Sequence, residues 1–208
     1  MKVIKNNNYW NNFYKNFLLK KETSFARFVF NKIRYKKNFK ILDIACGNGR
    51  DTFFFLKKGF QAKGLDISKT AIENNKKILR NKFFLKNICS KKFNIQEKYH
   101  FIYSRFFLHA INEKDEDIFF KNIKKISNKK TIVFLEFRTI KDPLMKKGFK
   151  ISQNERFFTH YRRFININDL LKKILKLQFR ILNISSSFNY AVFGRQKPHV
   201  CRLIIKLR

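Results

Sequence analysis

The sequence predicts an α/β fold: a seven-stranded, mostly parallel sheet with helices on both faces and an antiparallel hairpin at the C-terminus. Short apolar runs alternate with amphipathic segments through residues 39–137, which is typical of parallel strands joined by crossover helices. The first run leads directly into a glycine turn and a helix start, a unit typical of a nucleotide-cofactor site. Two later segments alternate apolar and polar residues around a turn at residues 194–198, and therefore predict the hairpin.

The individual elements follow from apolar periodicity, capping residues and glycine positions. Strands are predicted at residues 39–45, 61–65, 83–88, 99–104, 131–137, 178–193 and 199–207. Helices are predicted at residues 10–18, 24–33, 50–58, 69–80, 114–126 and 169–176. Thr23 or Ser24, Ser68 and Asn168 are the expected N-caps, and Gly59 is expected to end the third helix.

Two segments are candidates for covering a site. The helices within residues 1–38 either simply pack on the sheet or also form a lid, to which Trp10 and Tyr14 contribute. Residues 138–165 have the least regular pattern, and a loop of this length inside a compact domain is usually functional. We therefore expect one domain over residues 1–208, with 1–38 as an N-terminal helical lid and 138–165 as a substrate-side insertion.

The charge of the chain suggests a partner without identifying one. The 208 residues include 48 Lys and Arg but only 14 Asp and Glu, for a formal net charge of +34. Such a charge suggests nucleic acid or an anionic membrane surface. However, Lys, Asn, Ile and Phe all have A/T-rich codons, so genome composition alone would raise them together. The basic residues are scattered in pairs, which favours a solvated basic surface over a nucleic-acid groove.

Cysteine spacing and hydropathy indicate the compartment. Cys46, Cys89 and Cys201 form neither a CxxC pair nor a metal-like cluster, so no metal site is predicted. Reduced thiols are typical of the cytosol. No secretory signal and no run of 18 apolar residues is present. We therefore expect a cytoplasmic protein without a membrane span.

The glycine turn itself departs from a dinucleotide fingerprint. Thr52 stands where the third glycine would be, and Asp43 lies four residues before Gly47. A carboxylate there would repel pyrophosphate, but it suits a cofactor with an ammonium group, such as S-adenosylmethionine. Gly47 and Gly49 allow a tight turn and a close approach of the ligand. Asp66, at the end of the next strand, is placed to accept hydrogen bonds from two ribose hydroxyls.

The pattern D-x-x-x-G-x-G followed by an acid on the next strand resembles motifs I and II of the class I S-adenosylmethionine-dependent methyltransferases, which have a Rossmann-like fold. Residues 46–52 and 64–68 look like those of the small bacterial thiopurine and tellurite-resistance methyltransferases. The alternative is a generic α/β turn without a ligand. The cofactor-binding residues that the turn and this resemblance indicate are Trp10, Tyr14, Asp43, Ala45, Cys46, Gly47, Asn48, Gly49, Arg50, Asp51, Asp66, Ile67, Asn87, Ile88 and Ser104.

Two departures from related methyltransferases bear on the ligands. In the family pattern, strand three ends with an acid that accepts from the adenine amino group. Asn87 stands at that position here, and its amide oxygen would still accept. Residues 103–106 lack the N-P-P-Y/F-like tetrad that DNA and RNA amino-methyltransferases commonly use to hold an exocyclic amine. This absence favours another kind of acceptor.

The chemistry of the acceptor side depends on histidines and arginines. His109 and His160 are candidate catalytic bases, although each would serve equally well as a structural hydrogen-bonding group. Guanidinium groups match carboxylates and phosphates, and with so few acids in the chain not every arginine can be paired internally. The candidate substrate-binding residues are Arg105, Phe106, Arg138, Tyr161 and Arg162.

The predicted function is S-adenosylmethionine-dependent O- or N-methylation of a small molecule, an anionic or carbohydrate-type metabolite. The alternative is an RNA- or protein-directed methyltransferase that uses the basic surface. The scattered charges and the missing tetrad favour the small molecule.

Overall fold

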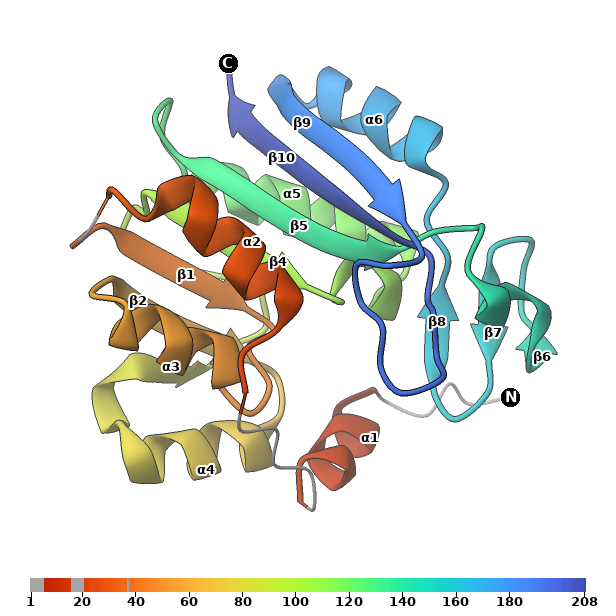
Figure 1. Ribbon diagram of the computed structural model, residues 1–208, viewed down its shortest axis with the longest axis horizontal. Coiled ribbons are helices and arrows are strands. Elements are labelled where there is room, and N and C mark those ends of the chain that lie inside the picture. Colours follow the sequence, from red (N-terminus) through yellow and green to blue (C-terminus); the bar gives the residue numbers. More distant parts are fainter. Residues whose placement is uncertain (1–5, 16–20, 37) are drawn as a thin grey trace.

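A seven-stranded sheet forms the centre of the computed structural model, which describes residues 6–15, 21–36 and 38–208 (Figure 1). The strands are β1 (Lys40–Ile44), β2 (Gln61–Asp66), β3 (Phe83–Leu85), β4 (Phe101–Arg105), β5 (Ile132–Arg138), β9 (Phe179–Ser187) and β10 (Val200–Leu207). Their order is β3-β2-β1-β4-β5-β10-β9. The first five strands pair in parallel, whereas β10 is antiparallel to both β5 and β9. The predicted fold class is therefore confirmed.

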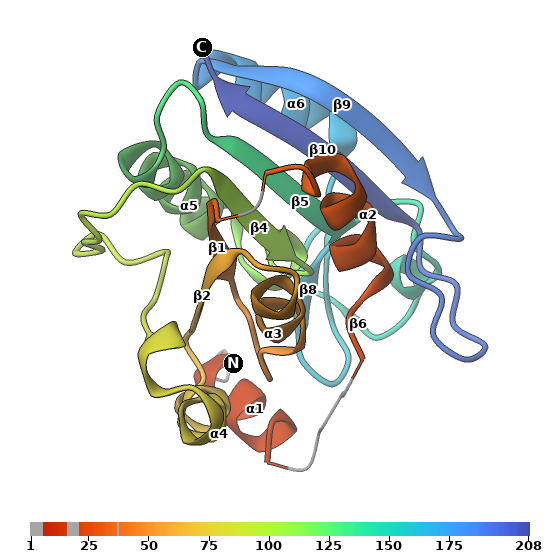
Figure 2. The same cartoon turned by 60° about the vertical axis from the view of Figure 1, so that its left-hand side comes forward.

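Helices cover both faces of the sheet (Figures 1 and 2). They are α1 (Asn6–Phe13), α2 (Ser24–Ile33), α3 (Arg50–Lys57), α4 (Lys69–Ile78), α5 (Glu113–Ile126) and α6 (Ile167–Lys176), with short 3₁₀ turns η1 (Arg80–Lys82), η2 (Leu108–Ala110) and η3 (Pro143–Lys146). Helices α2 and α3 contribute Phe25, Val29 and Phe55 to one apolar cluster. Helices α5 and α6 contribute to a larger cluster on the opposite face. Each face of the sheet therefore has its own core.

Strand β1 contributes apolar side chains to the clusters on both faces of the sheet. Leu42 and Ile44 belong to the cluster beneath α5 and α6, whereas Ile41 belongs to the cluster beneath α2 and α3. Successive side chains of a strand point to opposite faces, so a strand covered on both sides is apolar throughout. The strand Ile132–Arg138 is buried from its second residue onward for the same reason.

The capping predictions for α2 and α4 agree with the structure. Thr23 accepts a hydrogen bond from the Ala26 amide, and Ser68 accepts one from the Ala71 amide, so each satisfies an amide that its helix leaves unpaired. The prediction for α6 was wrong, because Asn166 rather than Asn168 is its N-cap.

The bounds of three elements differ most from those predicted. Strand β3 ends at Leu85 rather than residue 88, and β9 ends at Ser187 rather than residue 193. Helix α1 begins at Asn6 and ends at Phe13. The continuation of this helix that was predicted at Phe17 and Leu18 lies outside the described residues.

Residues 138–165 are more regular than predicted. They form a separate three-stranded antiparallel sheet of β6 (Phe149–Lys150), β7 (Glu155–Phe157) and β8 (Tyr161–Arg163). These strands are two or three residues long and partly exposed, so they carry almost no apolar alternation. Strands this short contain too few residues for an alternation of apolar and polar side chains to be detected.

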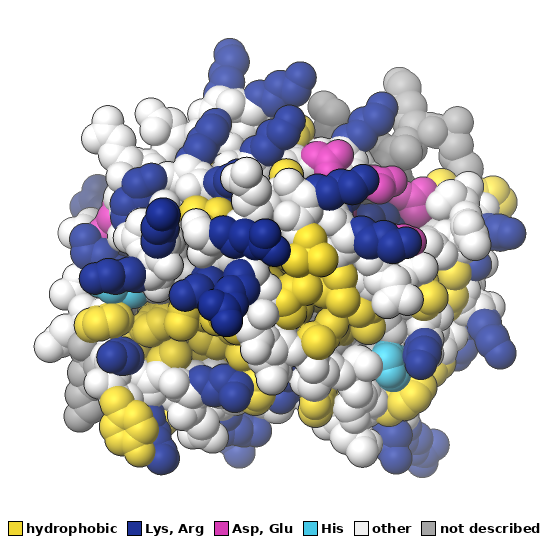
Figure 3. Space-filling view, turned by 90° about the horizontal axis from the view of Figure 1, so that it is seen from above, with side chains coloured by type: hydrophobic (Ala, Val, Ile, Leu, Met, Phe, Trp, Pro, Cys, Tyr) yellow, Lys and Arg dark blue, Asp and Glu magenta, His cyan; other side chains and the backbone are white. Residues whose placement is uncertain are grey.

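Lysine and arginine side chains spread over the face shown in Figure 3, among apolar patches and a few acids. They do not gather into one continuous basic groove on this face. Within the described ranges, no helix is long and apolar enough to cross a bilayer.

Glu136 on β5 connects three neighbouring strands through its buried carboxylate. Oε1 accepts from Nε of Arg105 on β4 at 2.9 Å, and Oε2 accepts from Nε of Arg202 on β10 at 2.8 Å. One carboxylate thus pairs with two guanidinium groups, neither of which is fully exposed to water. The parallel part of the sheet is joined in this way to its antiparallel edge.

We expect Glu136→Gln to lower the free energy of unfolding by about 3 kcal/mol, because it leaves two largely buried guanidinium groups without their counter-charge. Urea unfolding measures the change. The matched control is Glu73→Gln, which removes an exposed ion pair with Lys69 on α4 and should cost at most about 0.5 kcal/mol. Equal losses in the two variants would contradict the role assigned to Glu136.

Candidate functional site

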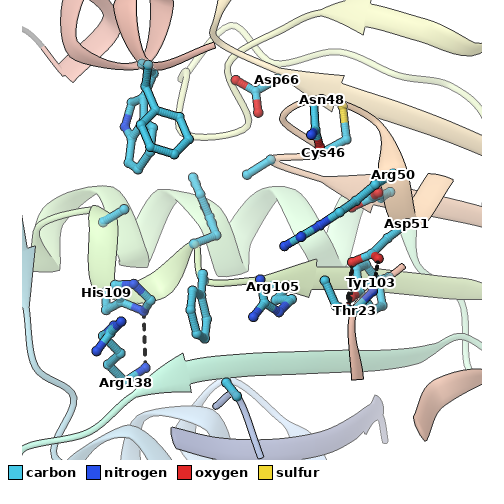
Figure 4. Close-up of a pocket in the computed structure, with 18 of the residues that line it drawn as sticks. Thr23, Cys46, Asn48, Arg50, Asp51, Asp66, Tyr103, Arg105, His109 and Arg138 are labelled. Carbon is cyan, nitrogen blue, oxygen red and sulfur yellow. Dashed lines mark hydrogen bonds between the residues drawn. The ribbon is translucent and has the colours of Figure 1, made fainter. Parts of the chain in front are cut away.

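A cavity of about 560 Å³ opens at the carboxyl ends of the parallel strands, where ligands bind in open α/β sheets (Figure 4). Its walls come from the turn after β1, the ends of β2 and β4, helix α1, strand β8 and the loop between β9 and β10. The predicted site residues that line it are Trp10, Tyr14, Asp43, Ala45, Cys46, Asn48, Arg50, Asp51, Asp66, Ile67, Ile88, Arg105, Phe106, His109, Arg138, His160 and Arg162.

The turn after β1 has a left-handed backbone at three positions. Ala45, Gly47 and Gly49 have φ values of 59°, 52° and 72°. A Cβ on Gly49 would lie 2.9 Å from the Phe83 ring, and one on Gly47 would lie 2.2 Å from the Tyr14 hydroxyl. Both glycines are therefore required by their neighbours as well as by backbone conformation. They shape the turn without lining the cavity themselves.

Asp66 connects this turn to the start of α4. Its Oδ2 accepts from the Gly47 amide at 2.9 Å, and its Oδ1 accepts from the Ser68 amide at 2.8 Å. The Ile67 amide also bonds to this carboxylate, and because a carboxylate has about four lone-pair sites, it keeps acceptor capacity for a ligand. Figure 4 shows this carboxylate directed toward the cavity. Its geometry fits two ribose hydroxyls, the role predicted for it.

Asp43 lies beneath the turn, and the pKa of its carboxyl group is shifted. Its Oδ2 accepts a 2.6 Å hydrogen bond from the Thr52 hydroxyl. Burial, together with the nearby charges of Asp51 and Asp66, raises the pKa of Asp43 well above its usual range. A cation bound among these three acids would be stabilised, which agrees with a cofactor that carries an ammonium and a sulfonium group.

Asp51 was predicted to bind cofactor, and the structure shows it in a hydrogen-bond network. Its carboxylate accepts from the Thr23 amide at 2.8 Å, the Thr23 hydroxyl at 2.9 Å and the Tyr103 hydroxyl at 2.7 Å (Figure 4). These bonds hold the start of α2 against α3 and β4. Asp51 borders the cavity, but its carboxylate already stabilises this junction.

The Cys46 side chain packs in a small apolar cluster with Ile72 and Phe83, within the turn that borders the cavity. Burial, with Asp43 and Asp66 nearby, raises the pKa of this thiol well above its usual value. All three cysteines are free and buried. Within the described part of the chain, no group of three or more His, Cys, Asp or Glu side chains could hold a metal ion.

Helix α1 and the residue after it lie next to both ends of the cavity. At one end Tyr14 contacts Gly47, and Asn11 accepts a 2.9 Å hydrogen bond from the Ser68 hydroxyl. At the other end the rings of Tyr9 and Trp10 lie 4.3 and 5.2 Å from that of His160 on the β7–β8 turn. The N-terminal segment and residues 138–165, both predicted to cover a site, therefore meet here.

His109 has a fixed tautomer. The Arg138 amide donates to its Nδ1 at 3.1 Å, so a neutral ring carries its proton on Nε2 (Figure 4). Burial, with Arg138 and Arg162 nearby, lowers the pKa of His109 well below 6.5. This arrangement favours a hydrogen-bond donor at Nε2 over a catalytic base. His160 is also neutral at pH 7, because burial and the same arginines lower its pKa to about 3.

The arginines of the site differ in their partners. Arg105 pairs with Glu136, and Arg138 donates to Asp142 at 2.8 Å. Arg162 is different: Ser127 Oγ and Arg162 Nε are the two buried side-chain polar atoms without a hydrogen-bond partner among the described residues. The Arg162 side chain lines the cavity and forms no ion pair with an acid among the described residues, so its guanidinium can pair with a ligand anion.

Besides the two glycines of the turn, three predicted residues lie outside the cavity lining. Asn87 is exposed, and it lies two residues beyond the end of β3. Its Oδ1 accepts from the Cys89 amide at 2.9 Å. Ser104 donates to the Ile44 carbonyl at 3.3 Å within the sheet, and the Tyr161 hydroxyl donates to Glu155. Their predicted ligand contacts find no support in these positions.

The sequence prediction missed one wall of the cavity. Residues Ala191, Val192, Phe193, Gln196 and Pro198 of the β9–β10 loop line it. They were assigned to the end of a strand and a hairpin turn far from the site in sequence. No local motif signals that this loop returns to the carboxyl ends of the parallel strands.

Comparisons with known proteins agree with this architecture. A family model described as a methyltransferase domain matches residues 35–178. A search of curated proteins finds no match. A solved S-adenosylmethionine-dependent methyltransferase from Clostridium acetobutylicum has a TM-score of 0.70 and 16% identity, with 96% of each chain covered. A TehB-like methyltransferase from Corynebacterium glutamicum has a TM-score of 0.66 and 14% identity, with 97% of this chain and 95% of that one covered.

A third structure, the glycopeptide N-methyltransferase MtfA in complex with S-adenosylmethionine, has a TM-score of 0.68. It is 14% identical, and the match covers 92% of this chain and 96% of that chain. At these identities the three structures establish a common fold.

We expect Gly47→Ala to displace Tyr14 and with it the only tryptophan, Trp10, because the added Cβ would overlap the tyrosine hydroxyl. Acrylamide quenching of tryptophan fluorescence should increase. The control is Gly194→Ala, which has a similar φ of 54° but no atom within 4 Å of the added Cβ. Each variant also carries about 1 kcal/mol of backbone strain. The same quenching in both would refute the contact between Tyr14 and the turn.

Proposed function

Since the chain belongs to the methyltransferase-domain family and is a class I S-adenosylmethionine-dependent methyltransferase, we propose that it methylates a small anionic or carbohydrate-type metabolite at oxygen or nitrogen. The bound cofactor supplies an electrophilic methyl group, which the lone pair of the acceptor attacks as the carbon–sulfur bond breaks. The observation that supports an anionic acceptor is the Arg162 guanidinium, which lines the cavity and has no acidic partner among the described residues.

Residues at the ends of β1 and β2 would hold the cofactor. The Asp66 carboxylate would accept hydrogen bonds from the ribose hydroxyls, and the negative charge of Asp43 would stabilise the cationic part of the cofactor. Ile67 and Ile88 line the same end of the cavity and would contact the adenine. Tyr14 and Trp10 would cover the bound cofactor from the N-terminal side.

Arg162 would bind the anionic group of the acceptor. Its neighbours Arg105 and Arg138 are already paired with Glu136 and Asp142, so neither needs a ligand charge. The Nε2–H of His109 would donate a second hydrogen bond. Neither histidine is a strong base at pH 7, so proximity and orientation inside a covered cavity would supply most of the rate.

We also propose the domain organisation and compartment that the sequence indicates. Residues 1–208 would form one methyltransferase domain, with 1–38 as a lid and 138–165 as the insertion that carries Arg162. The buried, free cysteines suit the cytoplasm. The alternative, methylation of RNA or protein, is favoured by the net charge of +34, but Lys and Arg side chains do not gather into one continuous groove on the face shown in Figure 3.

Methyl transfer from labelled S-adenosylmethionine to fractionated cell extract tests the proposal. Label should enter the small-molecule fraction. Arg162→Gln should lower this activity about 10- to 100-fold through a lost charge-assisted hydrogen bond, with unchanged cofactor affinity in calorimetry. Asp66→Ala should lose the cofactor affinity itself. The control for charge alone is Arg180→Gln, on the exposed part of β9.

Two results would contradict this proposal. Label that enters RNA or protein instead, with a rate that falls steeply with salt, would favour the alternative. Absence of any heat on titration with S-adenosylmethionine would reject a methyltransferase altogether.

We expect cofactor affinity to rise with pH in the range just below the raised pKa that Asp43 has in the free protein. In the free protein Asp43 is protonated in this window, and a bound cation lowers its pKa, so binding releases a proton and is favoured at higher pH. Calorimetry in buffers of different ionisation enthalpy measures the protons released. Asp43→Asn should reduce this release, whereas Glu73→Gln, on the exposed face of α4, should not. Unchanged proton release in Asp43→Asn would contradict the assignment.

A further inference from the structure

The loop between β9 and β10 presents apolar side chains to the same cavity as Arg162. Val192 is 48% exposed and Phe193 is 66% exposed, yet both line the cavity. Single exposed apolar residues are common on protein surfaces and need no explanation. A neighbouring pair on the wall of a ligand cavity is different, because a ligand that entered would cover it.

The loop is held in this position by defined contacts. Arg202, whose Nε pairs with Glu136, donates through its terminal nitrogen to the Tyr190 carbonyl and the Ser24 hydroxyl, both at 3.1 Å. The Arg202 guanidinium also lies 4.2 Å from the centre of the Tyr190 ring. The base of the loop is therefore anchored to the buried ion pair of the sheet and to the start of α2.

The tip of the loop is a closed turn. The amides of Phe193 and Gln196 each donate to the carbonyl of the other at 3.0 Å, and Gly194 between them has a φ of 54°. A turn of this kind fixes the direction of the Phe193 backbone without burying its ring. The apolar surface at the cavity is thus preformed, so a ligand would gain contact without the cost of ordering the loop.

The charges around the cavity set the other requirement. The Arg162 guanidinium lines the cavity and has no acidic partner among the described residues, whereas Glu136 and Asp142 pair with Arg105 and Arg138. An acceptor that carried only an anion would leave Val192 and Phe193 uncovered. A purely apolar acceptor would leave the guanidinium unpaired. Only a molecule with both features satisfies both walls.

We infer that the methyl acceptor is an anionic amphiphile, with a carboxylate, phosphate or sulfonate that binds Arg162 and an aryl or acyl portion that covers Val192 and Phe193. This inference rests on the proposed function and narrows its acceptor class. Phe193 is then a specificity-determining residue.

The probe for this inference is 8-anilinonaphthalene-1-sulfonate, an anion with an aromatic body, titrated by fluorescence into the cofactor-loaded protein. Phe193→Ser should weaken its binding about tenfold, through lost apolar contact. The matched control is Phe149→Ser on β6, where the ring is 62% exposed but outside the cavity lining, and its effect should stay below about twofold. Arg162→Gln should weaken the probe as well.

Methanesulfonate, which has the anion but no aromatic body, should displace the probe only weakly. Equal probe affinity in Phe193→Ser and Phe149→Ser would overturn the inference, as would displacement by methanesulfonate at concentrations similar to those of the probe. Calorimetric titration of the same variants with S-adenosylmethionine separates the two proposals. A wild-type protein that does not bind cofactor would reject the methyltransferase, while the probe comparison, repeated without cofactor, would still report on the apolar wall.

Discussion

The carboxylate of Asp66 is the interaction on which the site depends. It accepts one amide from the turn after β1 and one from the start of α4, and so joins the two chain reversals that face the cofactor end of the cavity. Helix α1 and the residue after it then rest on both of these reversals, through Tyr14 on Gly47 and Asn11 on Ser68. Without the Asp66 hydrogen bonds, the turn after β1, the start of α4 and helix α1 would no longer be held in fixed positions relative to one another. A single side chain thus converts two local turns into one binding surface.

The parts of this architecture that the sequence predicts are those encoded by neighbours in the chain. Apolar runs identify the parallel strands because both faces of the sheet are covered. The cap residues Thr23 and Ser68 act within three positions of themselves, and the glycine turn carries its own conformational signature. The spacing from Asp43 to Asp66 is likewise a property of a single βαβ unit. Local patterns of this kind indicate the fold and the cofactor end of the site.

The acceptor end depends on contacts between distant segments, which the sequence does not reveal. Asn87 has the right position in the family pattern, but its side-chain oxygen accepts from the Cys89 amide, and only its neighbours Lys86 and Ile88 line the cavity. The arginines all look alike in sequence. Only the folded chain shows that Arg105 and Arg138 have acidic partners and that Arg162 forms no ion pair within the part of the chain that the structure describes. The β9–β10 loop, which carries Phe193, reaches the site from the far edge of the sheet, and no sequence motif predicts this position.

Cys46 illustrates a hazard that any enzyme handling an alkylating cofactor must meet. A thiolate is the strongest nucleophile among ordinary side chains, and Cys46 belongs to the turn that lines the cavity, with its side chain packed against Ile72 and Phe83. Burial and the two nearby carboxylates keep it in the thiol form, which reacts poorly. The same negative charges that suit a cationic cofactor thereby suppress self-methylation of the enzyme. Protection of the catalyst and selection of its cofactor arise from one electrostatic arrangement.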